Sequence, residues 1–407
     1  MILAAVGCMV AGVWAQDGPP QARVNAVTDE LHGHKIVDPY RWLEDGDSAE
    51  TKKFVSDELA YTRSVLDALP GRAQIDARLT QLAETGSIGV VQVGGDYYFH
   101  TRRRGMQNQP VLYVRESAQE SDRVLVDVNA LAADGTVALD WWQPSHDGKF
   151  VAYGTSPSGS EMSTLHVIET ATGKMLPDVI DRSRAASVAW KLDDSGFYYT
   201  RYPKKGEVAE GQELYNRHVF YHALASDAAK DPLIFGKGRD PEDWPNVSLS
   251  DDGQWLLIQV SQGWTKSELY LADLENGGEP LRITSGKNFL YGGEVFEGNL
   301  YIHTNEDAPR YRVMKASVEE PQREHWAEII PQDGEAVLEG VGLIGGTLVA
   351  NYELNATSQM KIFATDGRLM EKVPLPGIGS VNGIGGNWDS REMFLLFESF
   401  TVPPGVY

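Results

Sequence analysis

The serine residues of this sequence do not form a recognisable nucleophile motif. A catalytic serine at a strand-to-helix turn requires the pentapeptide G-x-S-x-G, because that tight turn lifts the hydroxyl above the sheet. The nearest match is Gly154-Thr155-Ser156-Pro157-Ser158-Gly159, in which the spacing is wrong by one residue and Pro157 stands where a helix should begin. We therefore expect this segment to be a surface loop of a β-structure.

The nine histidines show no spacing typical of metal ligands. His218 and His222 are four residues apart in an apolar run, so they would share one face of a strand. A zinc site needs three or four converging ligands, and no Cys or Glu stands at a supporting distance in the sequence. His100 and His303 also fall in strand patterns, where a role in lining the sheet is expected. The sequence thus predicts neither a metal nor a cofactor.

The acidic residues are numerous, but their spacing does not identify a pair of catalytic carboxylates. Pairs such as Glu319-Glu320 and Asp193-Asp194 fall in turns, and two facing carboxylates of the glycosidase kind cannot be identified from spacing. The formal net charge of −22 disfavours nucleic acid or an anionic membrane as a partner, because both would repel the chain. An acidic, solvated surface that keeps an exported protein soluble is the simpler interpretation.

The first fifteen residues have the character of an export signal. An apolar run from Met1 ends in Val13-Trp14-Ala15 and is followed by polar, proline-containing sequence, which predicts a signal peptide of residues 1–15 and a periplasmic or secreted protein. The run is too short to span a bilayer, so no membrane span is expected. Cys8 after Ala5-Val6-Gly7 weakly resembles a lipoprotein cleavage box. If cleavage follows Ala15, the mature chain contains no cysteine, which rules out disulfides and thiolate catalysis.

The rest of the chain is organised by a repeated turn signal. Seven times a turn rich in Gly, Asp or Asn precedes a β-branched or aromatic run, which is a hairpin pattern. The turns centre on residues 95, 148, 196, 253, 298, 346 and 389, at intervals of 43 to 57 residues. Further apolar runs and turns follow in most units, so each unit would contain about four strands. A period of roughly 40 to 50 residues with several strands per unit is typical of propeller blades. We predict a mainly β chain with a seven-bladed β-propeller over residues 85–407.

The last of these seven units is shorter than the others. Its strands are expected near Val381, at Met393–Phe397 and at Gly405–Tyr407. This predicts an incomplete seventh blade whose second strand keeps a largely unpaired edge.

Residues 16–84 show helical periodicity instead. Asp47 and Glu50 are spaced as a capping box, and apolar residues then recur at helical spacing until Pro70-Gly71. A second helix carries Ile75 and Leu79 on one face and ends before Gly86. Both apolar faces need cover, and a polar propeller rim does not provide it, so we expect another domain to pack there.

Several segments resemble the prolyl oligopeptidase family of serine peptidases. The N-terminal segment Asp38-Pro39-Tyr40-Arg41-Trp42-Leu43-Glu44-Asp45 is similar to a signature of that family, and the similarity extends from about residue 25 to the end. Three further matches are Gln107–Val114, Tyr153–Ser160 and the closing Glu398–Tyr407.

The resemblance implies a seven-bladed propeller that caps an α/β-hydrolase domain, and it is this hydrolase domain that would cleave short peptides on the carboxyl side of proline. It also implies that the N-terminal helices pack on the hydrolase domain, which carries the Ser, Asp and His of the family. That domain is absent from this sequence, so we expect no catalytic residue here and no activity of the chain alone. In the intact enzyme the propeller would admit flexible peptides and exclude folded proteins.

Two tryptophans are the candidate substrate contacts. The segment Ser261–Lys266 is similar to a family loop that faces the substrate cleft, which puts Trp264 near the substrate, and Trp244 before Pro245 is a weaker candidate of the same kind. The alternative interpretation is a free-standing propeller that binds a peptide or protein. The two N-terminal helices argue against it, because a free-standing module would not need them.

Overall fold

The computed structural model describes residues 18–117, 119–132 and 134–407, which form two compact units. One unit extends to Glu84, and the other comprises Thr85–Tyr407. The expected signal peptide, its cleavage after Ala15 and Cys8 lie outside the described residues.

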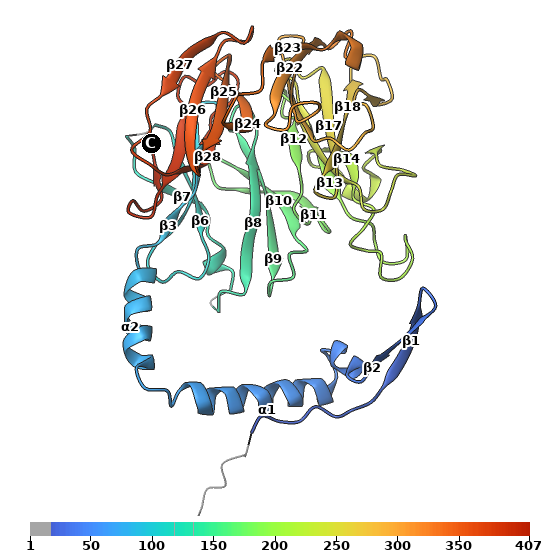
Figure 1. Cartoon of the computed structure of the whole chain (residues 1–407), viewed down its shortest axis with the longest axis vertical. Coiled ribbons are helices and arrows are strands. Elements are labelled where there is room, and N and C mark those ends of the chain that lie inside the picture. Colours follow the sequence, from blue (N-terminus) through green and yellow to red (C-terminus); the bar gives the residue numbers. More distant parts are fainter. Residues whose placement is uncertain (1–17, 118, 133) are drawn as a thin grey trace, which may run out of the picture. The chain divides into compact units, whose positions relative to one another are not determined.

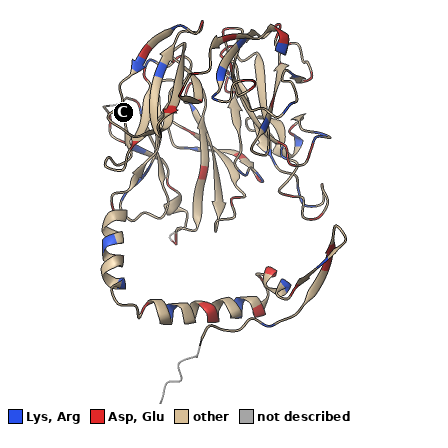
Figure 2. Cartoon of the chain, viewed as in Figure 1, with Lys and Arg blue, Asp and Glu red and all other residues tan. Residues whose placement is uncertain are grey.

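The N-terminal unit contains a short hairpin and two helices. Its elements are β1 (Val27–Leu31), β2 (His34–Asp38), η1 (Arg41–Glu44), α1 (Ala49–Leu66) and α2 (Arg72–Ala83). The hairpin was not predicted, because His32 and Gly33 form its turn with φ of 51° and 78° within a polar stretch that lacks an apolar alternating pattern. Charged residues of both signs alternate along α1 (Figure 2).

The start of α1 differs from the predicted capping box. Ser48, not Asp47, is the N-cap: it has an extended conformation and its Oγ accepts a hydrogen bond from the Thr51 amide at 3.2 Å. The expected box is therefore wrong by one residue, since Glu50 falls one position too early to reach back to the cap. Glu50 instead pairs with Arg23 at 2.6 Å.

The apolar residues of the two helices remain largely uncovered. The side chains Val55, Leu59, Val65, Ile75 and Leu79 are 44% to 62% exposed. An aromatic pair anchors α1, with Phe54 lying edge-on to Trp42 at 5.8 Å. The helices thus present apolar surface to their surroundings.

The unit Thr85–Tyr407 is a seven-bladed β-propeller whose sheets follow one another in chain order (Figure 1). In blade 1, β5 pairs with both β3 and β4, blades 2 to 6 have four strands each, and blade 7 has three. Blade 1 consists of β3 (Ser87–Ile88), β4 (Gln92–Gly94), β5 (Tyr97–Arg103), β6 (Val111–Arg115) and β7 (Arg123–Val126). Blade 2 consists of β8 (Val137–Pro144), β9 (Phe150–Pro157), β10 (Thr164–Glu169) and β11 (Met175–Ile180). Blade 3 consists of β12 (Val188–Trp190), β13 (Gly196–Arg201), β14 (His218–Ala223) and β15 (Leu233–Phe235).

Blades 4 to 7 continue the same antiparallel pattern. Blade 4 consists of β16 (Trp244–Leu249), β17 (Trp255–Gln262), β18 (Lys266–Asp273) and β19 (Leu281–Arg282), and blade 5 of β20 (Tyr291–Phe296), β21 (Asn299–Thr304), β22 (Arg312–Ser317) and β23 (Ala327–Ile330). Blade 6 consists of β24 (Val337–Ile344), β25 (Thr347–Leu354), β26 (Thr357–Phe363) and β27 (Leu369–Val373). Blade 7 consists of β28 (Ser380–Gly385), β29 (Phe394–Glu398) and β30 (Gly405–Val406). Short 3₁₀ turns occur at Val128–Ala130 (η2), Ala228–Lys230 (η3) and Arg323–His325 (η4). All seven predicted hairpins form, and the predicted fold is confirmed.

The core lies between blades rather than within one sheet. A cluster containing Leu257 and Leu269 of blade 4 packs against Tyr291 and Ile302 of blade 5, and comparable clusters join other neighbouring blades. Because each blade is covered on both faces, its middle strands contain continuous apolar runs, as in Trp255–Ile258.

The edge of blade 7 is better paired than the sequence predicted. β30 pairs with β29, and Tyr407 and Leu395 exchange both backbone hydrogen bonds at 2.9 Å. The expectation of a largely unpaired second strand is therefore wrong, because three residues suffice to cover most of a strand that is itself only five residues long.

Blades 1 and 7 meet without sharing a strand. The Tyr98 hydroxyl donates to Glu392 at 2.7 Å, its ring lies edge-on to Phe394 at 5.6 Å, and the Asn387 amide donates to the Val93 carbonyl at 3.3 Å. Among the described strands, β28 pairs only with β29. Side-chain contacts and a close approach of the two backbones, rather than a shared strand, therefore close the ring at this joint.

Candidate functional site

Trp244 and Trp264 line one cavity of about 780 Å³, which we call the tryptophan cavity. Trp244 begins β16, opposite Ser261 of β17, and Trp264 lies in the turn between β17 and β18. Gly263 adopts a φ of 65° in that turn, which suits glycine. The Trp264 side chain is 95% exposed, an unusual position for so large an apolar group.

Arg217 closes one wall of the tryptophan cavity and is only 2% exposed. Its guanidinium carbon lies 4.3 Å from the centre of the Trp244 ring, and its Nη2 donates to the Ala185 carbonyl at 2.9 Å and to the Thr200 hydroxyl at 2.7 Å. No carboxylate of the described residues forms an ion pair with it. Burial lowers the pKa of Arg217 to about 10, so the group remains charged at neutral pH.

Three buried donor atoms of the cavity wall, two of Arg217 and one of Tyr202, lack a hydrogen-bond acceptor among the described residues. The Nε and Nη1 atoms of Arg217 are buried without a hydrogen bond to any described residue, and the Tyr202 hydroxyl donates to none of them, although the Arg184 guanidinium lies close enough to interact with its oxygen. Tyr202 is 2% exposed and lies edge-on to Trp244 at 6.3 Å. Burial raises the pKa of Tyr202, so its hydroxyl stays protonated and can donate.

This arrangement favours a ligand that combines an apolar body with an oxygen acceptor. These donor atoms have almost no accessible surface, so a carbonyl or carboxylate bound in the cavity would be attracted by the positive charge of Arg217 rather than by a direct hydrogen bond to them. The neighbouring carboxylate of Asp243 does not serve this purpose, because it already accepts hydrogen bonds from Arg239 and Gln262, each at 2.6 Å.

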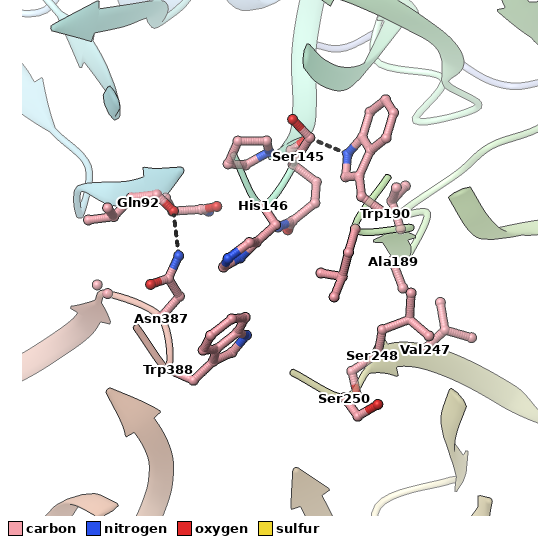
Figure 3. Close-up of a pocket in the computed structure, with 18 of the residues that line it drawn as sticks. Gln92, Ser145, His146, Ala189, Trp190, Val247, Ser248, Ser250, Asn387 and Trp388 are labelled. Atoms are coloured by element: carbon pink, nitrogen blue, oxygen red, sulfur yellow. Dashed lines mark hydrogen bonds between the residues drawn. The ribbon is translucent and has the colours of Figure 1, made fainter. Parts of the chain in front are cut away.

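A second cavity, of about 460 Å³, is lined by residues that include Ser145, Trp190 and Asn387 (Figure 3). β16 starts at the tryptophan cavity and ends at this one, which Val247–Ser250 help to line. The rings of His146 and Trp388 stack here at 4.4 Å, and His146 Nε2 lies 3.2 Å from Asp389 Oδ2. We call it the His146 cavity.

Sequence reasoning did not single out the His146 cavity. His146 and Trp388 do border two of the seven predicted turns, and a search for polar or aromatic residues next to the turns would have found them. Strand β4 of blade 1 and the first strands of blades 2, 3, 4 and 7 contribute to its wall, so the ends of these strands gather at this mouth of the propeller.

The structure does not bring a nucleophile and a base together. Ser156 is 1% exposed at the end of β9, and its hydroxyl donates to Asp140 at 3.0 Å. His222 is fully buried between Asp178 and Asp231, while His303 stacks on Tyr311 and contacts the Leu338 carbonyl at 2.8 Å. Within residues 18–117, 119–132 and 134–407, no group of three or more His, Cys, Asp or Glu could hold a metal ion. Nor is any helix of these ranges both long and apolar enough to cross a membrane.

Comparisons with known proteins agree with this architecture. The profile of a family described as "Prolyl oligopeptidase, N-terminal beta-propeller domain" matches residues 19–407. The prolyl endopeptidase of Elizabethkingia meningoseptica is 29% identical over 392 residues, which are 95% of this chain and 55% of that protein. The prolyl endopeptidase of Elizabethkingia miricola is 30% identical and is also covered to 55% of its length. This chain therefore spans about half the length of these curated relatives.

Solved structures show the same relationship. A structure from a study of two prolyl endopeptidases and their inter-domain dynamics superimposes with a TM-score of 0.89 at 31% identity, over 96% of this chain and 58% of that one. Prolyl oligopeptidase B of Galerina marginata, bound to a 35-residue substrate, has the same fold with a TM-score of 0.82 at 23% identity. Together with the seven blades and the N-terminal helices, these matches show that the chain belongs to the prolyl oligopeptidase family and corresponds to its N-terminal β-propeller domain.

Proposed function

We propose that this chain is the propeller part of a serine endopeptidase that cleaves short peptides after proline. The observation that carries the proposal is the tryptophan cavity, in which Trp244 and Trp264 provide apolar walls and the buried guanidinium of Arg217 has no paired carboxylate among the described residues. A peptide combines these features, because apolar side chains alternate with carbonyl oxygens along it. The relatives that share the fold bear the name prolyl endopeptidase, which fits a peptide ligand.

In this proposal the propeller limits substrates by size. Folded proteins are too wide to enter a ring whose blades pack directly on one another, whereas a flexible peptide can follow the cavities at the two ends of β16. Catalysis itself would come from a Ser, His and Asp in a hydrolase domain that the N-terminal helices contact.

Peptide binding to the chain tests the role of the tryptophan cavity. A proline-containing hexapeptide titrated by calorimetry should bind, and Trp264→Ala should weaken binding by about tenfold or more, as is usual for a central aromatic contact. Since Trp264 is 95% exposed, its replacement should not disturb folding. Phe400→Ala is the matched control, because Phe400 is also an almost fully exposed aromatic residue and does not line the tryptophan cavity.

Unchanged binding in Trp264→Ala and Trp244→Ala would contradict the proposed cavity. Tight binding of a folded protein, with no binding of short peptides, would instead favour the alternative of a free-standing binding module.

A fusion tests cleavage and size limitation. We expect this chain, joined to the part of the Elizabethkingia meningoseptica relative that it does not match, to cleave a succinyl-Gly-Pro reporter and to leave a folded protein intact. The unfused chain should release no product above buffer. Equal cleavage of folded and short substrates by the fusion would refute the size filter.

We further propose that the protein is exported, on the basis of the apolar run that ends at Ala15. Mass spectrometry of protein from its natural host should then find Gln16 at the N-terminus. An intact Met1 in the cytosolic fraction would overturn export, and a lipid on Cys8 would indicate the lipoprotein route.

A further inference from the structure

A third cavity, of about 240 Å³, lies between blades 4, 5 and 6 and shares no residue with the two described above. Its wall includes Glu294 of β20, Gln259 of β17 and His303 of β21, together with backbone of β24. We call it the Glu294 cavity.

Glycines create the space in front of its polar atoms. A Cβ atom at Gly342 would lie 3.8 Å from Glu294 Oε1, and one at Gly292 would lie 3.7 Å from Gln259 Oε1. Neither glycine has a positive φ, so the backbone conformation does not require glycine at either position. Strand interiors favour β-branched residues, and glycine there often marks close approach of another group.

Glu294 has a hydrogen-bond donor but no cation beside it. Its Oε2 accepts from the Leu343 amide at 3.0 Å, and no Lys or Arg of the described residues forms an ion pair with it. The carboxylate is partly exposed to the cavity but lies deep in the propeller. Burial therefore raises the pKa of Glu294 to about 7, although the Leu343 hydrogen bond opposes the shift.

The other titratable groups around the cavity do not supply the missing charge. Burial lowers the pKa of His303, which keeps the imidazole neutral while its Nε2 contacts the Leu338 carbonyl. Tyr301 has no positive charge, and Lys315 behind its ring donates to the carbonyl of Thr365 at 3.3 Å. Gln259 is uncharged, and β24 contributes only Gly340, Val341, Gly342 and Leu343 to the wall.

The cavity thus combines a carboxylate, an amide oxygen and open space, which suits a small cationic donor. A charge-assisted hydrogen bond from an ammonium group is roughly twice as strong as a neutral one and also neutralises the buried carboxylate. We propose that the Glu294 cavity binds a primary ammonium group, with Glu294 as the charged acceptor and Gln259 as the second acceptor. This site needs nothing from the proposed peptidase activity and goes beyond it.

Calorimetric titration with n-propylammonium tests the site in the chain as it is. The apparent affinity should rise about tenfold between pH 6 and pH 8, because the ionised fraction of a carboxyl with a pKa of about 7 rises by that factor. Repeating the titration at pH 7 in two buffers of different ionisation enthalpy should show release of about half a proton. At pH 7, glycinamide and Nα-acetyl-lysinamide distinguish an α-ammonium from a lysine side chain as the source of the group.

A matched pair of variants assigns the effect to one carboxyl. Glu294→Gln should weaken propylammonium binding by at least about tenfold, whereas Glu339→Gln, on the neighbouring β24 and exposed, should leave it unchanged. Binding of n-butanol as tight as that of propylammonium, displacement of the amine by millimolar K⁺, or binding to the wild-type chain without proton release would each overturn the proposal. The proton-release measurement requires no variant, so it decides the question even if Glu294→Gln fails to fold.

Discussion

His222 links two blades through a fully buried carboxylate–imidazole–carboxylate chain. Its Nε2 lies 2.9 Å from Asp178 of β11, and its Nδ1 lies 3.0 Å from Asp231, which also accepts from the Tyr199 hydroxyl at 2.7 Å. Burial alone would lower the pKa of His222, but the hydrogen bonds to Asp231 and Asp178 outweigh it and raise the pKa above its usual range. The protonated ring therefore contributes to stability.

The direction of the pKa shift of His222 determines how its contribution to stability depends on pH. A raised folded-state pKa gives stability that is fully present below the unfolded pKa of about 6.5 and is lost as the pH rises through the folded value. We expect His222→Gln to destabilise the chain by about 3 kcal/mol at pH 6, because two buried carboxylates lose their cation, and by less at pH 9. Urea unfolding at both pH values measures this, with His218→Gln on the same strand as the control. An equal loss at pH 6 and pH 9 would show that the ring is not protonated.

Glu294 has the opposite effect on stability. Burial raises the pKa of Glu294 to about 7, so above that pH the folded chain must hold an ionised carboxylate at a buried site. The resulting loss in the free energy of unfolding is absent below about pH 4.5 and complete above pH 7. The stability of Glu294→Gln relative to the wild type should therefore increase when the pH is raised from 5 to 8, by no more than about 3 kcal/mol. Chemical unfolding at both pH values tests this. Glu339→Gln should show no such trend, and a constant difference for Glu294→Gln would contradict the expectation.

At the scale of elements, the sequence was most informative about turns. At six of the seven hairpins a Gly or Asp of the turn adopts a positive φ that most other residues rarely take, as at Gly148 and Gly253 with φ of 73° and 74°. Such local requirements are visible in the sequence. The β1–β2 hairpin and the Ser48 cap were missed because polar residues satisfy several turn and cap geometries equally well.

The joint between blades 1 and 7 depends on close backbone contact. A Cβ atom at Gly385 of β28 would lie only 1.7 Å from the Val91 carbonyl oxygen, so any side chain would force the two blades apart. Gly385→Ala should lower the free energy of unfolding by about 3 kcal/mol, at the upper end of overpacking effects. Gly340→Ala on β24 is the control, since no atom lies within 4 Å of its Cβ position and its φ is not positive. Equal urea midpoints for the two variants would contradict a tight joint.

The N-terminal helices should be the least protected elements. Their apolar residues are 44% to 62% exposed, whereas the central strands of the blades contain side chains such as Leu256 and Leu269 with no exposure at all. We expect amides of residues 37–84 to exchange with solvent much faster than those of blades 2 to 5. Hydrogen exchange followed by mass spectrometry measures this. Equal protection would mean that the helices are held by the propeller, and the free-standing module would become the better interpretation.

At the scale of the whole molecule, local patterns predicted the architecture but not the cavities. Each blade contains a turn followed by an apolar run, and this pattern is visible within one short stretch of sequence. The number of blades therefore followed from counting these stretches. The cavities instead join residues far apart in the chain, such as His146 with Asp389 and Arg217 with Trp244. Which strand ends face each other depends on how seven sheets close into one ring, and no spacing in the sequence records that closure. Trp244 and Trp264 were found together only because a family resemblance supplied the missing geometry.

The closure of the ring also has a mechanical consequence. Each neighbouring pair from blade 1 to blade 7 is joined by the polypeptide itself, while blades 7 and 1 are held by contacts such as Tyr98 with Glu392 and Asn387 with Val93. Under tension a covalent link bears load that a few side chains cannot. A stretching force applied across the joint of blades 7 and 1 should therefore break the contacts between these two blades first. Each blade would remain folded while the ring opens at this joint.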